Sequence, residues 1–588
     1  MFLFESDDAI CYYNGVMIDD VELTGNPYYL PNLTYYWPPG WDWPIVASST
    51  TGTHSADELW SGEPAYIDLA IQNDGWLDIE DMIYTALYID DEYITYFSKS
   101  ELASYGYHSW TDYAVTLDEG YHTLKMVIDY TDIIEEEDEY DNEYSISFEW
   151  KRPEITYCGT VQCTDMNPPS HLIPVKGAKI EMLDRTASGE RILATEHTYD
   201  DGYFTFPSQE NIDTDSSRLD IFFKIYAEND ACYLYDRNNV RQAHITNTIY
   251  EHDNGTFDST FFISSVKNHC FYIANVVLEG YDYVPQYVTM PQTCIIADSG
   301  VGTGHSGGII YVDNSINNSY HYPDSYDKDV ILHEYGHVIE HSCSSFDASP
   351  GGTHSWIDSV SVELAASEGF AHFWSCVVRN DEKIRNYRNN FADYYGFNLE
   401  NGEEDNNGVI LYSANNYGDV NEGTVAGILW DIYDGNNDDY SWWTGTPGQG
   451  YQDGRMDNLS NGADNIMDVL INRNVSGHHP DNMEEFWDAW FTSPSKDSSY
   501  LMRDIWYEHG VNKPCCIAIR GNANCSNDEE PDIADITRLI DYLYLSRDPL
   551  CCIEETDANC SGGAPDISDI TRIIDYVYLS HTPLCSCP

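Results

Sequence analysis

Basic residues are scarce in this chain of 588 residues. Lysine and arginine together number 27, against 100 aspartates and glutamates, which gives a formal net charge of -73 at pH 7. So strong a negative charge repels phosphate backbones and anionic lipids, and it therefore argues against nucleic acid and membrane surfaces as partners. A protein with this charge favours cations as binding partners. The acidity also fits solubility or salty surroundings, and it names no function by itself.

Long apolar runs are missing as well. No segment approaches the roughly 20 apolar residues that span a bilayer, so we expect no transmembrane helix. The start, MFLFESDDAI, lacks the basic and apolar regions of an export signal. Yet eight of the 16 cysteines lie in the last 74 residues, and this density favours an oxidising compartment. We expect a secreted or surface-attached protein whose signal was removed or lies outside this sequence.

The chain length predicts several domains, at roughly 100 to 200 residues each. Residues 1–40 carry no interpretable pattern. Residues 41–152 alternate apolar and polar positions between turn residues, as in AYIDLAIQNDG, which predicts an antiparallel β-sandwich. The pieces IQNDGWLDIEDMIYTALYIDD and LDEGYHTLKMVID resemble the CARDB family, which implies an immunoglobulin-type sandwich. The acidic stretch 135–139 fits a solvated strand edge better than a calcium site.

A second β-rich segment covers residues 153–262. Its pieces IPVKGAKIEMLD and TYDDGYFTFP resemble the carboxypeptidase regulatory-like domain, which implies a small transthyretin-like β-sandwich. Cys158 and Cys163 are close enough in sequence to pair across a turn, although sequence does not fix the connectivity. Neither β-rich segment contains a catalytic constellation, so both are expected to be spacers or binding modules.

Residues 263–511 show helical spacing instead of alternation. The pattern predicts helices over 327–342, 360–378, 422–434 and 482–491, with a strand at GGIIYVDN, residues 307–314, ahead of the first of them. The segment is long enough to bury its own core. We therefore predict a mainly α domain.

The first of these helices contains the sequence DVILHEYGHVIEH. Residues four apart share a helix face, so His333 and His337 present two imidazoles side by side, as zinc requires. Glu334 is then placed to reach a water molecule instead of the metal, which is the position of a general base. A chance match to this pattern is expected in roughly one such chain in twenty, so a third ligand is needed to decide.

The helix VELAASEGFAHFWS offers that ligand. Glu368 is an acid among small and apolar residues, where burial is costly unless the group is paired or bound to a metal. This arrangement resembles the gluzincin metallopeptidases of thermolysin and fungalysin type. The resemblance implies that His333, His337 and Glu368 bind zinc and that Glu334 is the general base. Glu363 competes as third ligand, but Glu-Gly-Phe-Ala matches the family better than Val-Glu-Leu.

Two departures from the family put the rate of catalysis in doubt. His372 stands where an aspartate commonly orients a liganding histidine. The helix YGDVNEGTVAGILWDIYD also lacks the histidine that stabilises the oxyanion in these enzymes. Tyr417 is the candidate donor, with His478 and His479 as alternatives. In the expected reaction a zinc-activated water attacks an extended peptide, which adds as a strand to the edge of GGIIYVDN.

Residues 512–588 form an internal repeat, in which a loop with oxygen-bearing side chains precedes a helix twice. Oxygen ligands at alternate loop positions suit Ca²⁺. The pattern resembles the type I dockerin, which implies a cohesin-like partner or self-assembly. Cys525 and Cys560 suggest disulfides to the nearby Cys-Cys pairs. The expected calcium ligands are Asn522, Asn524, Ser526, Asp532, Asp535, Asp557, Asn559, Ser561, Asp566 and Asp569.

The sequence thus predicts two N-terminal all-β sandwiches, a mainly α zincin-like peptidase domain and a small α calcium-loop tail. The expected function is that of a secreted zinc-dependent endopeptidase, with Zn²⁺ and Ca²⁺ as cofactors and a peptide or protein as substrate. The alternative is an extracellular structural or adhesive protein whose peptidase-like domain is an inactive scaffold.

Overall fold

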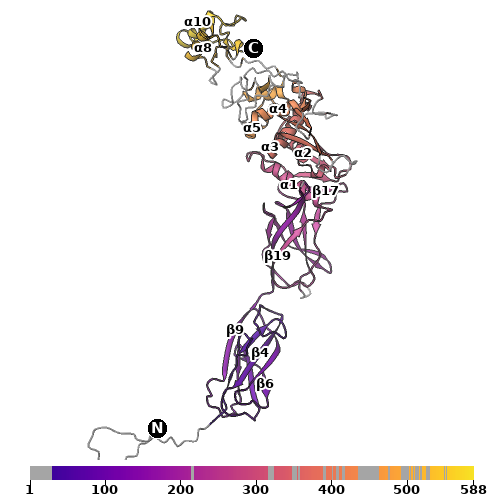
Figure 1. Ribbon diagram of the computed structural model, residues 1–588, viewed down its shortest axis with the longest axis vertical. Helices are drawn as coiled ribbons and strands as arrows, with labels where there is room; N and C mark the ends of the chain where they lie inside the picture. Colours follow the sequence, from indigo (N-terminus) through magenta and orange to yellow (C-terminus); the bar gives the residue numbers. More distant parts are fainter. Residues whose placement is uncertain are drawn as a thin grey trace, which may run out of the picture. The chain divides into compact units, whose positions relative to one another are not determined.

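The computed structural model divides the chain into two compact units (Figure 1). The first consists mainly of residues 1–155, and the second holds most of the remainder. Among the described residues, no helix combines the length and the apolar character needed to cross a membrane. The structure describes residues 29–167, 169–213, 218–315, 323–346, 354, 358–388, 393–399, 402–405, 410–412, 418–434, 462–474, 477–491, 502, 505–506, 509, 511, 516, 519–524, 530–548, 550 and 552–587.

The first unit contains two sheets that share one core. In one sheet β4 (Pro64–Asn73) pairs with β1 (Leu33–Tyr35), β2 (Ile45–Ser48) and β7 (Tyr107–Thr116). The other sheet has the order β3 (Leu59–Trp60), β9 (Glu143–Lys151), β8 (Gly120–Val127), β5 (Ile83–Ile89), β6 (Glu92–Lys99). Buried side chains from both sheets form the core, among them Ile45, Leu69, Leu87, Leu124 and Trp150. This is the sandwich that the alternating pattern predicts.

The sandwich begins earlier than the sequence suggests. Leu33 pairs with Asn73 and Tyr35 with Ile71, so β1 is part of a sheet although it lies inside the segment 1–40 that carries no interpretable pattern. A strand of three residues is too short for alternation to be recognised. The predicted boundary at residue 41 is therefore wrong for this strand.

The next β region belongs to the second unit for most of its length. The long strand β10 (Glu154–Asp165) pairs with β11 (His171–Pro174), β14 (Tyr203–Thr205), β15 (Gln209–Glu210) and β19 (Gly255–Phe262). A separate sheet has the order β13 (Gly189–His197), β12 (Lys179–Thr186), β16 (Ile221–Tyr226), β18 (Ala243–Ile245). Two sheets are thus present over the residues where the sequence predicts a second sandwich.

The suggested Cys158–Cys163 disulfide does not form. Both residues lie on β10, with no turn between them, and both are free thiols. Successive side chains of a strand point to opposite faces, so an odd separation places these two sulfurs on opposite faces of the sheet.

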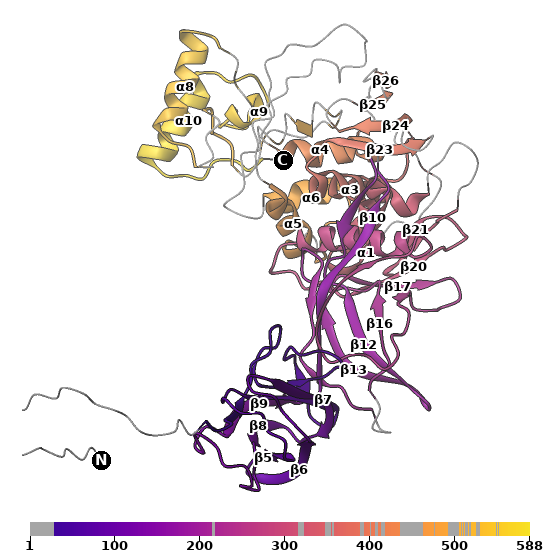
Figure 2. The same ribbon diagram turned by 60° about the horizontal axis from the view of Figure 1, so that its bottom comes forward.

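A third sheet crosses the predicted boundary at residue 262. Its order is β17 (Cys232–Asp236), β20 (Thr293–Ala297), β22 (Ile309–Val312), β21 (Gly304–Ser306), and β17 pairs parallel to β20. The strand β17 therefore comes from the segment assigned to the second sandwich but completes the sheet of the helical region. Figure 2 shows β17 and β20 beside each other and close to α1.

The predicted helices are present with small shifts at their ends. They are α2 (Lys328–Cys343), α3 (Val362–Arg379), α4 (Glu422–Tyr433) and α6 (Met483–Trp490). A helix that the sequence analysis did not single out, α1 (Asn268–Asp282), precedes them, and α5 (Gly462–Asn472) lies between α4 and α6. An antiparallel meander follows α3, consisting of β23 (Lys383–Arg388), β24 (Asp393–Asn398), β25 (Gly402–Asp405) and β26 (Ile410–Tyr412).

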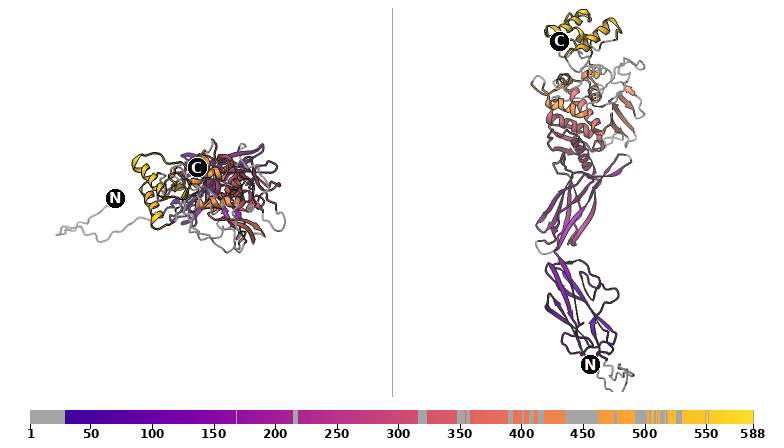
Figure 3. Two further views of the ribbon diagram at one scale, coloured as in Figure 1. Left: turned by 90° about the horizontal axis from the view of Figure 1, so that it is seen from above. Right: turned by 90° about the vertical axis from the view of Figure 1, so that its left-hand side faces the viewer.

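Each copy of the repeat in the tail contains a helix, and the tail helices are drawn in yellow near the C-terminus in Figure 3. The helices α8 (Ile533–Tyr544) and α10 (Ile567–Ile574) each begin with an aspartate capping box, and a short helix, α9 (Ile553–Thr556), lies between them. Disulfides join Cys516 to Cys587 and Cys560 to Cys585. Cys560 thus pairs near the C-terminus instead of with a Cys-Cys pair, and Cys525 lies outside the described residues.

The helices α2 and α3 approach closely at a glycine. A Cβ added to Gly336 would stand 2.9 Å from the Cα of Ala371. The stripe of Ile331, Tyr335 and Val338 is fully or almost fully buried, as its spacing predicts. The two helices therefore pack backbone to backbone at the level of Gly336.

The close approach predicts the effect of Gly336→Ala. Alanine favours a helix over glycine by about 1 kcal/mol, but overpacking at this contact costs about 1–3 kcal/mol. We expect a net fall in Tm, measured by differential scanning calorimetry. Gly304→Ala is the control, since a Cβ there meets nothing within 4 Å. An unchanged or raised Tm for Gly336→Ala would contradict the packing.

Candidate metal centre

Three side chains from α2 and α3 converge on one point. The Nε2 atoms of His333 and His337 are 3.2 Å apart. The Oε2 atom of Glu368 lies 3.2 Å from Nε2 of His333 and 3.3 Å from Nε2 of His337. The residues that the HExxH pattern and the Glu368 helix single out are thus brought together, two from one turn of α2 and one from the facing turn of α3.

The triangle fits a tetrahedral metal ion. Ligand atoms about 2.0 Å from a zinc ion are separated by about 3.3 Å in a tetrahedron, close to the three observed distances. Oε2 of Glu368 is buried and has no hydrogen-bond donor among the described residues. Burial lowers the pKa of His333 to about 3, which favours the neutral form that binds metals, whereas the carboxylates of Glu340 and Glu368 outweigh burial and raise the pKa of His337. The donor set therefore suits zinc.

Glu334 lies beside this triangle without being part of it. It is buried on α2, and burial raises the pKa of its carboxyl to about 7. It shares a cavity of about 690 Å³ with the three converging residues. Its position next to His333 thus matches the place expected for a general base.

The cavity has a strand along one side. Its lining residues are Thr303, Gly304, His305, Ser306, Gly307, His333, Glu334, His337, Glu340, His341, His354, Ser367 and Glu368. Gly304–Ser306 form β21, the outermost strand of its sheet, whereas β22 has a neighbour on each side. The prediction that a peptide adds to the edge of GGIIYVDN is therefore wrong, because β21 covers that edge. Among the described strands, β21 is the one at the edge of this sheet beside the cavity.

A carboxylate on α2 itself orients His337. Oε2 of Glu340 lies 2.9 Å from Nδ1 of His337 and accepts a hydrogen bond of 2.7 Å from the Ser367 hydroxyl. Glu340 is fully buried. Sequence analysis looked for this support at His372 and missed Glu340, although a glutamate three residues after the second histidine shares its helix face.

His372 packs against the centre instead. Its ring lies on that of His333, with centroids 4.3 Å apart, and its Nε2 atom is 3.7 Å from Oε1 of Glu422. The buried Glu422 also receives a hydrogen bond of 2.7 Å from Nδ1 of His354. That bond raises the pKa of His354. Burial raises the pKa of Glu422, but the hydrogen bonds from the two histidines outweigh it and hold this pKa below its usual range.

Glu363, His478 and His479 do not belong to the triangle. Glu363 lies in the first turn of α3, five residues before Glu368, and therefore does not share its face. His478 and His479 are not among the described residues that line the cavity. Tyr417 lies outside the described residues. The described part of the chain thus does not bring His478 or His479 into the cavity, and the prediction for Tyr417 lies outside it.

Several of the predicted calcium ligands of the tail cap helices or accept hydrogen bonds from nearby backbone N–H groups. Asp532 and Asp566 cap α8 and α10 through their side chains. Asp535 and Asp569 accept backbone N–H groups of the preceding loops, including those of Asn524 and Asn559.

Asp557 is paired with a cation of the chain itself. One carboxylate oxygen lies 2.7 Å from Nη1 of Arg520, and the other accepts the backbone N–H of Ser561. Asn522 is buried, and Ser526 lies outside the described residues. In the described part of the tail, no three acidic, histidine or cysteine side chains gather as a metal site.

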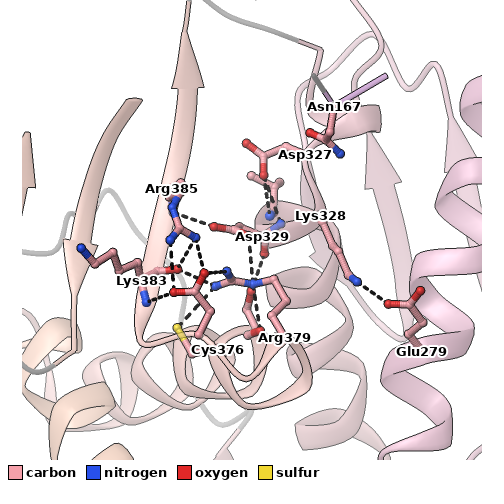
Figure 4. A network of polar contacts seen from close by, with 12 residues as sticks. Asn167, Glu279, Asp327, Lys328, Asp329, Cys376, Arg379, Lys383 and Arg385 are labelled. Carbon is pink, nitrogen blue, oxygen red and sulfur yellow. Dashed lines mark hydrogen bonds and ion pairs between the residues drawn. The ribbon is translucent and has the colours of Figure 1, made fainter. Parts of the chain in front are cut away.

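A buried ion network fixes the start of α2 to α3 and β23 (Figure 4). Oδ1 of Asp329, one turn before His333, lies 2.9 Å from Nε of Arg379, and Oδ2 accepts the backbone N–H of Arg385 at 2.6 Å. Arg385 in turn makes a two-pronged pair with Asp381. The network sets the register between the two helices that carry the candidate ligands.

Two family models match parts of the chain. The mycolysin C-terminal domain matches residues 302–510, and CARDB matches residues 45–146. The first segment contains α2, α3 and α4, and its match associates this helical region with peptidases of the M4 family. The second identifies the first unit as carrying a CARDB domain of surface or adhesion type. No curated protein matches the chain.

Solved structures resemble only parts of the chain. The CARDB domain of a Pyrococcus furiosus protein, in complex with di-metal ions, is 14% identical, with 21% of this chain and 98% of that one covered and a TM-score of 0.17. A domain from Methanosarcina acetivorans described as part of a cell surface protein is 17% identical, with 21% and 92% covered and a TM-score of 0.15. A bacterial adhesin from Mobiluncus mulieris is 8% identical, with 38% and 100% covered and a TM-score of 0.16.

The buried network predicts a large cost for Asp329→Ala. Removal of Asp329 leaves the buried Arg379 with the more distant Asp381, 3.7 Å from its Nη1 and shared with Arg385, as counter-charge. The loss of one partner of a buried ion pair typically costs about 3–5 kcal/mol.

The neighbouring Lys328→Ala is the control, because Lys328 and Glu279 are one third exposed and such pairs contribute about 0–1 kcal/mol. Urea unfolding of both variants measures the difference. Equal losses of unfolding free energy would show that the network does not stabilise the fold.

Proposed function

We propose that this protein is an extracellular zinc-dependent peptidase. The observation that carries the proposal is the triangle formed by His333, His337 and Glu368, whose edges of 3.2, 3.2 and 3.3 Å suit three ligands of one tetrahedral ion. The match of the surrounding segment to a peptidase-associated domain supports it. The disulfides Cys516–Cys587 and Cys560–Cys585 and the CARDB match support an extracellular location.

In this proposal each side chain at the centre has a defined task. When bound, a zinc ion supplies Lewis acidity that lowers the pKa of a water molecule and polarises a carbonyl group. Glu334 accepts the proton of the attacking water and returns it to the leaving amine. Glu340 holds the ring of His337 through Nδ1, so that Nε2 faces the metal position.

The cavity suits an extended peptide. Among the described strands β21 is the outermost of its sheet and lies along the side of the cavity, and a peptide can add beside it as a further strand. Glu334 and Glu368 lie in the same cavity, within reach of a peptide bond held beside β21. The substrate class is therefore an unfolded or flexible segment of a protein.

Glutamine variants of three glutamates test the proposal. We expect the wild-type protein to hold about one zinc per chain and to cleave casein. Glu368→Gln loses the zinc, because a neutral amide replaces the anionic ligand. Glu334→Gln keeps the zinc and loses cleavage, since the general base is removed. Zinc is measured by inductively coupled plasma mass spectrometry.

Glu363→Gln is the matched control on the same helix as Glu368. It should keep both zinc and activity, because Glu363 lies outside the cavity-lining residues. Zinc binding without cleavage in the wild-type protein would favour the alternative, in which the domain is an inactive scaffold of an adhesive surface protein. A wild-type protein without zinc would refute the metal site.

We also propose that the tail is a calcium-dependent tether. Its two halves expose the same apolar residues at equivalent positions, Ile533 and Ile567, and Leu545 and Leu579. Exposed apolar patches of this kind mark protein interaction sites. A cohesin-like domain or a second copy of the chain is the proposed partner.

Calcium removal tests the tail. If Ca²⁺ binds the loops, we expect EGTA to lower the Tm of the transition that reports on α8 and α10, because a ligand that binds only the folded state stabilises it. Asp566→Asn should reduce the shift, with exposed Asp548→Asn as control. A Tm that is the same in calcium and in EGTA would show that the Asp557–Arg520 pair and the caps suffice without the ion.

A further inference from the structure

A group of tyrosine rings covers part of one sheet in the first unit. On β5 the side chains of Ile83, Thr85 and Leu87 are fully buried, so the tyrosines next to them lie on the opposite face of the sheet. On the neighbouring strand β6, Tyr93 and Tyr96 are each 50% exposed. We call this surface the tyrosine face. Its members are Tyr84, Tyr88, Tyr93, Tyr96 and Tyr130.

The five rings form one continuous surface. The ring centroids of Tyr84 and Tyr96 are 5.7 Å apart, and those of Tyr88 and Tyr93 are 5.8 Å apart. Tyr130 joins the two pairs, at 6.2 Å from Tyr96 and 6.3 Å from Tyr93. Its backbone N–H donates to the carbonyl oxygen of Tyr84 at 3.2 Å. These contacts hold the rings in place, so little conformational freedom remains to be lost when a partner binds.

A cation of the chain itself already lies on this surface. Nζ of Lys125 is 5.2 Å from the centroid of the Tyr88 ring and 3.0 Å from Oδ1 of Asp91. The face of an aromatic ring carries negative charge density, which attracts ammonium and guanidinium groups. The exposed rings of Tyr93 and Tyr96 offer the same chemistry to a cation from solution.

Carboxylates border the tyrosine face. Asp90 and Asp91 form the turn between β5 and β6, and their side chains are 48% and 89% exposed. Glu92 follows as the exposed first residue of β6. The whole chain carries a formal net charge of -73. This surface therefore attracts a positively charged partner, and a second copy of the chain is repelled.

We propose that the tyrosine face binds a flexible segment of another protein that carries arginine or lysine side chains. The inference goes beyond the proposed peptidase function and does not depend on it. In this complex a guanidinium or ammonium group lies over a ring, as Lys125 lies over Tyr88, and the carboxylates of the turn attract the segment from a longer distance. Tyrosine and arginine are also the residue types that dominate binding energy at many protein interfaces.

Two synthetic peptides test the proposal on the full chain. One consists of six repeats of Gly-Ser-Arg, and its matched control consists of six repeats of Gly-Ser-Gln. Both are titrated calorimetrically at physiological salt, which screens attraction between exposed charges beyond about 8 Å. We expect the arginine peptide to bind and the glutamine peptide to give no binding heat.

Paired substitutions on β6 separate the rings from the general acidity of the chain. Tyr93→Ser combined with Tyr96→Ser should weaken the arginine peptide about 5- to 30-fold, as for the loss of two exposed cation–π contacts. Tyr93→Phe combined with Tyr96→Phe should keep the wild-type affinity, because the aromatic rings remain. Tyr140→Ser is the control, since Tyr140 is 97% exposed and is not a member of the tyrosine face.

A further variant should bind more tightly than wild type. Lys125→Gln removes the cation that lies over Tyr88 and leaves Asp91 without this ion pair. One more ring and one more carboxylate then become available to the arginine peptide, so its affinity should rise about two- to five-fold. A general loss of structure in the serine variant cannot produce this gain.

Four results would overturn the inference. One is an arginine-peptide affinity of the paired serine variant that equals that of wild type, and another is weaker binding to Lys125→Gln. The third is equal binding of the glutamine peptide or of a neutral hexasaccharide such as maltohexaose, which would make the surface a site for uncharged ligands. The fourth is a wild-type dimer in sedimentation experiments that the paired serine variant dissociates, since a second copy would then cover the rings. Failure of the peptidase proposal is distinct, because none of these measurements depends on zinc or on cleavage.

Discussion

The candidate centre depends on how closely α2 and α3 approach. The ligand triangle has two corners on α2 and one on α3, so the two edges that end at Glu368 depend on the distance between the helix axes. Gly336 lies between the two histidines of α2, and its missing side chain lets the backbone of Ala371 come within contact distance. Any larger residue separates the helices and with them Glu368 from His333 and His337. The glycine inside the HEYGH sequence is therefore as much a part of the centre as the ligands.

The close approach of the helices brings several buried carboxylates together, and neighbouring imidazole and hydroxyl groups compensate their negative charge. Glu334, Glu340, Glu368 and Glu422 are largely buried within one region of a protein that already carries a large negative charge. Each of the last three contacts an imidazole within 3.4 Å, and Glu340 also receives a hydroxyl. Among the described residues Glu334 forms no such contact with an imidazole. Burial is therefore the main influence on its pKa and raises it. The unpaired carboxyl is the one proposed to carry a proton.

Sequence reasoning predicted what is local. The helices followed from apolar spacing, and the structure shows that Asp327 and Ser361 cap α2 and α3 by accepting backbone N–H groups. The histidine pair and Glu334 followed from spacing on one helix. Glu340 was within reach of the same logic, at three residues from His337, but the family pattern directed attention to position 372.

The features that the sequence did not predict depend on contacts between segments that are distant in the sequence. His354 stands outside any regular element, and only the packing of α4 on α3 brings Glu422 to it. Likewise β17 joins β20 in parallel, a pairing that the alternation within either strand does not reveal. The sequence also did not reveal that β21 pairs with β22, because a strand of three residues is too short for alternation to be recognised.

The described cysteines before the tail are free thiols, whereas the tail contains disulfides. Outside the tail, Cys163 and Cys232 on strands and Cys270 and Cys376 on helices are buried thiols, and burial raises the pKa of Cys163 and Cys270 to about 12. A thiol with so high a pKa forms little thiolate and reacts slowly with oxidants, so these residues act as small apolar side chains. The tail buries only a small core around Ile536, Leu539, Ile570 and Ile573, and its disulfides add the stability that so small a core does not provide. The crowding of cysteine at one end of the sequence thus reflects core size as well as compartment.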